Sequence, residues 1–190
     1  THFSVLDQDG NAVSITQTVN TSFGSGMIIE STGIILNNEM DDFSAQPGVP
    51  NIYGLVGAEA NSIAPQKRPL SSMSPTILVK DGQTFMVIGS PGGPRIITTV
   101  VQAIINVIDY GMDIQSAVDG PRIHHQWKPN KLRVEADYPI DTLTTLLNLG
   151  HQIEQKGSWS LAHGIIFEAN TGIIYGGADH RNQNSLAIGW

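Results

Sequence analysis

Residues 75–110 combine a hairpin, a glycine-rich turn and a helix pattern, and this combination constrains the fold more than any other part of the chain. Two apolar segments, 75–80 and 84–89, flank an Asp-Gly step that is typical of a hairpin turn. The second segment runs directly into Ser-Pro-Gly-Gly-Pro at 90–94. From 95 to 110 apolar residues recur at helical spacing, and Gly111 suits the position after a helix end. We therefore expect a strand that enters a helix through a tight turn.

This turn is a candidate site for an anion or a developing oxyanion. Glycine turns at a helix N-terminus present backbone N–H groups to a ligand. The alternative is a tight connection that binds nothing. The turn is not a dinucleotide-binding motif, because the G-x-G-x-x-G spacing is absent.

The first twenty residues predict a second hairpin, with strands at 3–6 and 12–19 joined by a turn that holds Asp-Gly and Gly-Asn steps. Alternation in the second strand places apolar side chains on one face and small polar ones on the other. The apolar set is Val13, Ile15 and Val19, and the polar set is Ser14, Thr16, Thr18 and Asn20. The polar face is either a solvated edge or one face of a site. Hydroxyls and amides in place of Lys and Glu keep the second alternative open.

The remaining elements indicate a single α+β domain over residues 1–190 with antiparallel strands. Residues 33–36 predict a short, buried strand that ends in the polar segment 37–43, and residues 44–74 lack periodicity, which is typical of a lid or a binding loop. Further helices are expected at 113–119 and 141–149, and further strands at 131–135, 151–155, 164–168 and 173–176. No linker divides the chain.

Composition excludes several classes of function. The net charge of −7 and the pI near 5.2 argue against nucleic-acid binding. The absence of cysteine excludes thiol catalysis, disulfides and thiolate metal sites. The sequence contains no run of about 18 apolar residues, so it predicts no membrane span. His124 and His125 would point to opposite sides of a strand, so we expect them to be structural, and we predict neither a metal nor a cofactor.

The chain begins with Thr1 in place of a methionine. We expect this residue to have been exposed by cleavage, because an N-terminal threonine can be a nucleophile. Its hydroxyl attacks while its own α-amine, with a pKa of roughly 8, acts as the adjacent base. The alternative is a chain boundary without chemical meaning.

Three ordered segments carry a family resemblance. They are LNNEMDDF at 36–43, KRPLSSMSPT at 67–76 and GSPGG at 89–93, and the similarity extends to Asp179, His180 and Arg181. The chain resembles the small subunit of γ-glutamyltranspeptidases, a family within the N-terminal-nucleophile hydrolases. The resemblance covers nearly the whole chain and is weakest from about residue 135 to 162. It implies a four-layered αββα sandwich with antiparallel sheets, completed by a separate large subunit from the same precursor.

The resemblance assigns four residues to the chemistry. Thr1 corresponds to the nucleophile exposed by autocatalytic cleavage, and Thr18 to a threonine that hydrogen-bonds it. The backbone N–H groups of Gly92 and Gly93 correspond to the oxyanion hole, which is the role that the strand–turn–helix pattern also suggests.

A further six residues correspond to the substrate site. Asn20, Glu39 and Asp42 match the groups that hold the donor's α-amino group, and such acceptors suit an ammonium. Ser71 and Ser72 match hydroxyls that bind its α-carboxylate together with an arginine of the large subunit. Residues 47–57, with Tyr53, resemble a lid over this site, although a surface loop without catalytic effect is the alternative.

Two departures from the family pattern concern the proposed chemistry. The family begins its small subunit with two threonines before the histidine, whereas only Thr1 precedes His2 here. Counting back from Thr18 and Asn20 matches Thr1 to the second of the pair. The nucleophile is then either a preceding threonine or, if cleavage has moved by one residue, Thr1 itself. Pro94 stands where the family commonly has a small residue, and it lacks an N–H group.

The implied activity is transfer or hydrolysis of the γ-glutamyl group of glutathione and related γ-glutamyl amides, with water, an amino acid or a peptide as acceptor. The family also implies a periplasmic or extracellular location. Alternatives within the fold are a glutaryl-type β-lactam acylase and a γ-polyglutamate hydrolase. An inactive subunit that lacks the nucleophile is the non-enzymatic alternative.

Overall fold

The structure is a computed structural model that describes residues 1–189. Its contacts separate into two compact units: unit 1 comprises Thr1–Thr16 and the chain from Met73 onward, and unit 2 comprises Gln17–Ser72. Among the described residues, no helix has both the length and the apolar character needed to cross a bilayer.

Unit 1 is built on a four-stranded antiparallel sheet in the order β11-β10-β6-β5. Its strands are β5 (Thr76–Lys80), β6 (Gln83–Gly89), β10 (His163–Glu168) and β11 (Ile173–Ala178). β6 leads through the short helix η3 (Gly93–Arg95) into α1 (Ile96–Ile108), and α2 (Ile114–Asp119) follows. The predicted strand–turn–helix is therefore confirmed.

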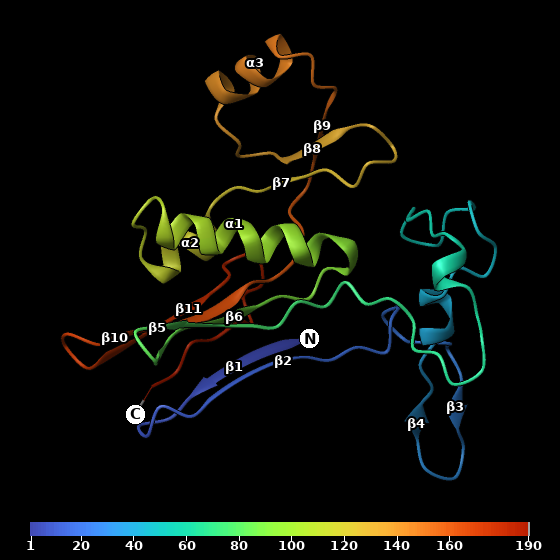
Figure 1. The fold of residues 1–190 in the computed structure, drawn as a ribbon, viewed down its shortest axis with the longest axis horizontal. Coiled ribbons are helices and arrows are strands. Elements are labelled where there is room, and N and C mark those ends of the chain that lie inside the picture. The colour runs from blue at the N-terminus through green and yellow to red at the C-terminus, as the bar shows by residue number, and fades with distance from the viewer. Residues whose placement is uncertain (190) are drawn as a thin grey trace. The chain divides into compact units, whose positions relative to one another are not determined.

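Helices and a hairpin cover opposite faces of this sheet. Figure 1 shows α1 and α2 on one face, and the hairpin of β1 (His2–Leu6) and β2 (Ala12–Thr16) on the other. The last residues of β6 are fully buried because side chains on both faces are covered. The helix side of the sheet forms the main core, which contains Met86, Ile88, Ile96, Val100, Ala103, Ile114, Val118 and Ala162.

The β1–β2 hairpin turns its polar face inward. His2 is buried, and the Ser14 hydroxyl donates a 3.0 Å hydrogen bond to the Ile88 carbonyl of β6. The apolar side chains of the hairpin face outward, with Phe3 46% and Val13 42% exposed. The alternative of a solvated polar edge is therefore wrong for β2. The strand also ends at Thr16, three residues earlier than predicted.

A second small sheet in unit 1 contains β7 (Ile123–His124), β8 (Leu132–Glu135) and β9 (Ile153–Lys156), with α3 (Ile140–Asn148) between the last two strands. Leu132, Val134 and Leu143 form its core. β8 and β9 run parallel, which differs from the all-antiparallel prediction. The physical reason is that a helix connects them, and a crossover helix returns the chain in the same direction.

Unit 2 contains little regular structure. It holds the two-residue strands β3 (Ile28–Ile29) and β4 (Ile34–Ile35), which pair with each other, and the short helices η1 (Glu39–Asp42) and η2 (Glu59–Asn61). The segment predicted as a buried strand at 33–36 is exposed, because its only strand neighbour in the described chain is β3. Apart from η2, residues 44–74 have the irregular structure that was expected, up to the start of β5.

Candidate active site

The head of β1 carries the first candidate group. Thr1 lies immediately before the strand and is exposed, and partial burial of its α-amine lowers the pKa of that amine from the usual value. A lower pKa leaves more of the amine unprotonated near neutral pH, as a general base requires.

The glycine turn carries the second candidate group, the backbone N–H groups of Gly92 and Gly93. Gly92 has φ +145° and Gly93 has φ +60°, and both lie at the entry to η3 and α1. An added Cβ on Gly92 would overlap the Ser160 side chain, so the turn depends on glycine there for two reasons. Pro94 falls in the first turn of η3, where a missing N–H costs no helical hydrogen bond.

The turn is held from the side by the segment before β10. Ser90 is completely buried; its hydroxyl donates to the Pro91 carbonyl and accepts a 3.1 Å hydrogen bond from the Leu161 N–H. Ser160, next to Leu161, has the positive φ of +62° and packs against Gly92. These contacts fix the backbone that presents the Gly92 and Gly93 N–H groups.

In unit 2, acidic and amide groups gather around η1. The Tyr53 hydroxyl is 3.0 Å from both the backbone and the side-chain oxygen of Asn20, and the Asn20 amide donates to the Asn38 carbonyl at 3.1 Å. Burial raises the pKa of Glu39, and the neighbouring Asp42 charge raises it further. Burial likewise raises the pKa of Asp42. Two neighbouring carboxyls that are both partly desolvated favour a bound cation.

The other predicted residues of unit 2 have more local contacts. The Thr18 hydroxyl accepts a 2.8 Å hydrogen bond from the Asn20 N–H, which shapes the backbone where Asn20 has φ +72°. Ser71 and Ser72 lie in an irregular segment at the end of the unit. The structure thus brings Thr18, Asn20, Glu39, Asp42 and Tyr53 into one neighbourhood in unit 2, whereas Thr1, Gly92 and Gly93 belong to unit 1.

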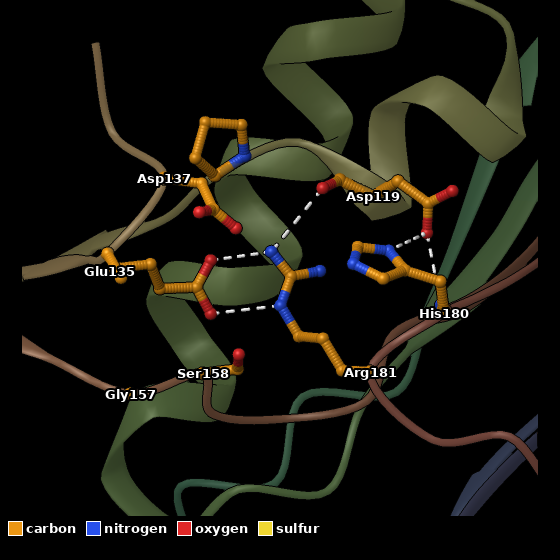
Figure 2. Close-up of a pocket in the computed structure, with 9 residues that line it drawn as sticks. Asp119, Glu135, Asp137, Gly157, Ser158, His180 and Arg181 are labelled. Carbon is orange, nitrogen blue, oxygen red and sulfur yellow. Dashed lines mark hydrogen bonds and ion pairs between the residues drawn. The ribbon is translucent and has the colours of Figure 1, made fainter.

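A buried network of ion pairs lies next to the segment that packs against the turn. Asp179 is fully buried, and its two oxygens accept from Arg122 and Arg181. Figure 2 shows the Arg181 guanidinium against both oxygens of Glu135. The network grips the segment before β10, because Trp159 N–H donates to Glu135 and Ala162 N–H donates to Asp179.

The whole sequence matches a known family. Residues 1–189 match the family model described as Gamma-glutamyltranspeptidase. The chain belongs to the γ-glutamyltranspeptidase family.

Relatives and solved structures agree with this membership. The chain is 53% identical over 190 residues to the glutathione hydrolase proenzyme of Escherichia coli, covering 100% of this chain and 33% of that protein. It thus spans about a third of the length of this relative. A γ-glutamyltranspeptidase variant from Helicobacter pylori has a TM-score of 0.92 at 52% identity, covering 96% of this chain and 100% of the solved one. The enzyme from Pseudomonas nitroreducens in complex with L-DON has a TM-score of 0.92 at 40% identity, with full coverage of both chains. The predicted α+β fold of the N-terminal-nucleophile hydrolases is confirmed.

The residues that hold the turn in this γ-glutamyltranspeptidase family member carry no sequence pattern that predicts their role. Asp179 and Arg181 lie in a segment that resembles the family, and Ser160 lies where the resemblance is weakest. A buried acid such as Asp179 cannot be distinguished from a solvated one in a polar Asp-His-Arg segment. The two adjacent glycines of the turn are the only local indication in this segment that another part of the same chain packs closely against the turn.

A small cavity of about 100 Å³ lies beside the network and is lined by Asp119, Glu135, Asp137, His180 and Arg181, among others (Figure 2). Within the described residues, Asp119, Asp179 and His180 come close enough to share a cation. However, both Asp179 oxygens are engaged by arginines, and His180 Nδ1 is 2.8 Å from Asp119. We therefore assign no ion to this cluster.

Proposed function

We propose that this chain is the catalytic part of an enzyme that transfers or hydrolyses γ-glutamyl groups through an acyl-enzyme. The observation that carries the proposal is the cluster of Asn20, Glu39 and Asp42 beside Tyr53, whose amide and carboxyl oxygens suit an ammonium such as the donor's α-amine. The family match over residues 1–189 supplies the reaction class.

In the proposed reaction the Thr1 hydroxyl attacks the γ-amide carbonyl and its proton passes to the α-amine of the same residue. The Gly92 and Gly93 N–H groups stabilise the resulting oxyanion. Collapse of this intermediate breaks the amide bond, and the amine proton moves to the leaving nitrogen. Water, an amino acid or a peptide amine then attacks the ester and releases the γ-glutamyl group.

The remaining predicted residues bind the donor in this proposal. Asn20, Glu39 and Asp42 hold the α-amine, Ser71 and Ser72 hold the α-carboxylate, and Thr18 orients the attacking group. Tyr53, whose hydroxyl already contacts Asn20, closes over the donor as part of the 47–57 lid.

We further propose that residues 1–190 act as one small subunit beside a large subunit from the same precursor, in the periplasm or outside the cell. The chain covers a third of the Escherichia coli proenzyme but all of the solved Helicobacter pylori chain, as expected for one of two chains. The outward apolar face of the β1–β2 hairpin offers a surface for that partner. This partner would supply the last layer of the αββα sandwich.

A glutaryl-type acylase or a γ-polyglutamate hydrolase would present a different group where the α-amine is held. The desolvated carboxyls of Glu39 and Asp42 favour the amine-bearing donor.

Burst kinetics of the assembled two-chain protein test the proposal. A chromogenic γ-glutamyl anilide should give a rapid first release of anilide followed by slower turnover, and the glutaryl anilide, which lacks only the α-amine, should react far more slowly. Equal rates for the two donors would favour the acylase, and the absence of both burst and turnover would exclude acyl transfer.

A further inference from the structure

His2 and His163 form a stacked pair inside unit 1 that the proposed reaction does not use. Their ring centroids are 6.4 Å apart with an interplanar angle of 21°. His2 comes from β1, and His163 is the first residue of β10 in the central sheet. The stack therefore joins the outer hairpin to the sheet.

The His2 ring also fills space that a glycine leaves open. His163 pairs directly with Gly89 across β10 and β6, and a Cβ on Gly89 would overlap the His2 ring. The His2 imidazole thus lies over the cross-strand pair of Gly89 and His163, and the His163 imidazole lies beside it. Gly89 is the last residue of β6, so the contact is made at the start of the turn that carries Gly92 and Gly93.

Both nitrogens of His2 have hydroxyl partners. Nδ1 is 2.8 Å from the Thr16 hydroxyl on β2, and Nε2 is 3.1 Å from the Ser4 hydroxyl on β1. The Ser4 hydroxyl in turn donates to the His163 carbonyl at 3.5 Å. A neutral ring satisfies this arrangement, because hydroxyls can donate to one nitrogen and accept from the other. The ring orientation is thereby fixed from two strands.

The surroundings disfavour charge on either ring. Burial, His163 and the α-amine of Thr1 lower the pKa of His2 to about 4. Burial also lowers the pKa of His163, whose Nδ1 is buried without a hydrogen-bond partner, although the Asp179 charge opposes this shift. The facing groups from β2 and β6 are Thr16 and Gly89, and neither titrates.

We propose that His2 and His163 form an uncharged imidazole clamp that fixes the head of β1 against the start of the glycine turn, and so act as positioning residues for acyl transfer. This inference rests on the proposed function, in which the attacking hydroxyl lies next to His2 and the oxyanion donors follow Gly89. Protonation of either ring places a charge in a buried stack beside the α-amine, and the strand then loses its fixed position.

Three variants of the assembled two-chain protein test the clamp. In His2→Asn the stack and one hydroxyl contact are lost, and we expect kcat to fall by about 100-fold while KM stays within about threefold, because the misplacement affects the reacting atoms and not donor binding. In His163→Phe an aromatic ring that cannot titrate keeps the stack, so kcat at neutral pH should stay within about threefold of the unsubstituted protein. The matched control is His151→Phe, an exposed histidine after α3.

The decisive readout is the pH profile of kcat at saturating donor. Protonation of the Thr1 α-amine sets the first fall of kcat on the acid side in every variant. A second, steeper fall at lower pH, where the imidazoles take up protons, should move to still lower pH in His163→Phe and stay in place in His151→Phe, a change that a purely structural role would not produce. An unchanged second fall in His163→Phe, or a His2→Asn variant that alters KM and not kcat, would overturn the clamp. If His2→Asn does not assemble, the His163→Phe profile alone decides. Absence of turnover in the unsubstituted protein would instead count against the proposed function.

Discussion

Gly92 is the residue at which backbone conformation and proposed chemistry depend most directly on each other. Its φ of +145° is rarely adopted by L side chains, and Ser160 occupies the place where a Cβ would project. The N–H groups of the turn can keep their direction only while this position is glycine.

We predict that Gly92→Ala lowers kcat by about 100- to 1,000-fold, the effect of removing one oxyanion donor. Gly82→Ala is the matched control, because Gly82 also has a positive φ, of +78°, but no atom lies within 4 Å of its added Cβ. Steady-state kinetics of the two variants provide the measurement. Similar kcat values for both would show that the turn does not stabilise the oxyanion.

A second residue-scale prediction concerns Asp42 and pH. The raised pKa values of Glu39 and Asp42 mean that these groups take up protons above the usual carboxyl range, and a protonated pair holds an ammonium poorly. For an amine-bearing donor, kcat/KM should therefore fall as pH drops through these raised pKa values. Asp42→Asn should raise KM by about 10- to 100-fold, as expected for loss of a charge-assisted hydrogen bond.

Asp41→Asn is the control for Asp42, because both residues lie on the short helix η1. The hydrogen bond described for the Asp41 side chain comes from the Asn38 amide. The KM of the Asp41→Asn variant should match that of the unsubstituted protein. Equal KM values for Asp42→Asn and the control would remove Asp42 from the donor site.

At the scale of elements, the turn after β6 depends on an ion network that starts at the other end of the chain. Asp179 follows β11, Arg122 precedes β7 and Glu135 ends β8, and together they hold the segment that packs on Gly92. The network thus joins the central sheet, the small sheet and the turn.

Breaking this network should destabilise unit 1 strongly. We expect Asp179→Asn to lower the free energy of unfolding by about 3–5 kcal/mol, because Arg122 then remains buried without its partner. Glu154→Gln removes the partly exposed ion pairs with Arg133 and Lys156 and should lower the free energy of unfolding far less. Chemical denaturation of the assembled protein measures both, and equal losses would show that the buried network contributes no more than a surface pair.

Elements with a clear hydrophobic period could be predicted from the sequence, and long-range contacts could not. The apolar spacing in α1 and the Asp-Gly turn before β6 are local, and both elements are confirmed. Alternation also separated Val13 and Ile15 from the polar face of the hairpin. It could not tell which face packs inward, because that depends on the layers present on each side. The parallel register of β9 likewise depends on tertiary packing.

The candidate site was predicted unevenly for the same reason. Glu39, Asp42 and Gly92 lie in segments whose composition is unusual enough to attract attention. The stack of His2 on His163 joins positions far apart in the sequence, and a lone histidine in a strand carries no pattern that would reveal it. The roles of all the predicted site residues stay predictions.

At the scale of the whole molecule, the exposed apolar face of β1 and β2 indicates a surface that binds a partner chain. Phe3, Val5, Val13 and Ile15 are each at least 40% exposed and lie on one side of the hairpin. Apolar patches of this kind typically mark an interaction surface.

We predict that Val13→Lys prevents stable association with the large subunit, because a charge on this face would be buried without a partner. Ile140→Lys, at an exposed apolar position on α3, should leave association intact. Co-purification of the two chains through a tag on the large subunit gives the answer. Recovery of the Val13→Lys chain in normal amounts would exclude the hairpin from the interface.

The central claim is that the head of this chain forms an ester with the γ-glutamyl group. The most direct measurement is to quench the assembled protein during turnover of a γ-glutamyl anilide and to map the adduct by peptide mass spectrometry. We predict one γ-glutamyl group on the N-terminal peptide, attached to the Thr1 hydroxyl. An adduct on any other residue, or turnover without a trapped adduct, would contradict the account.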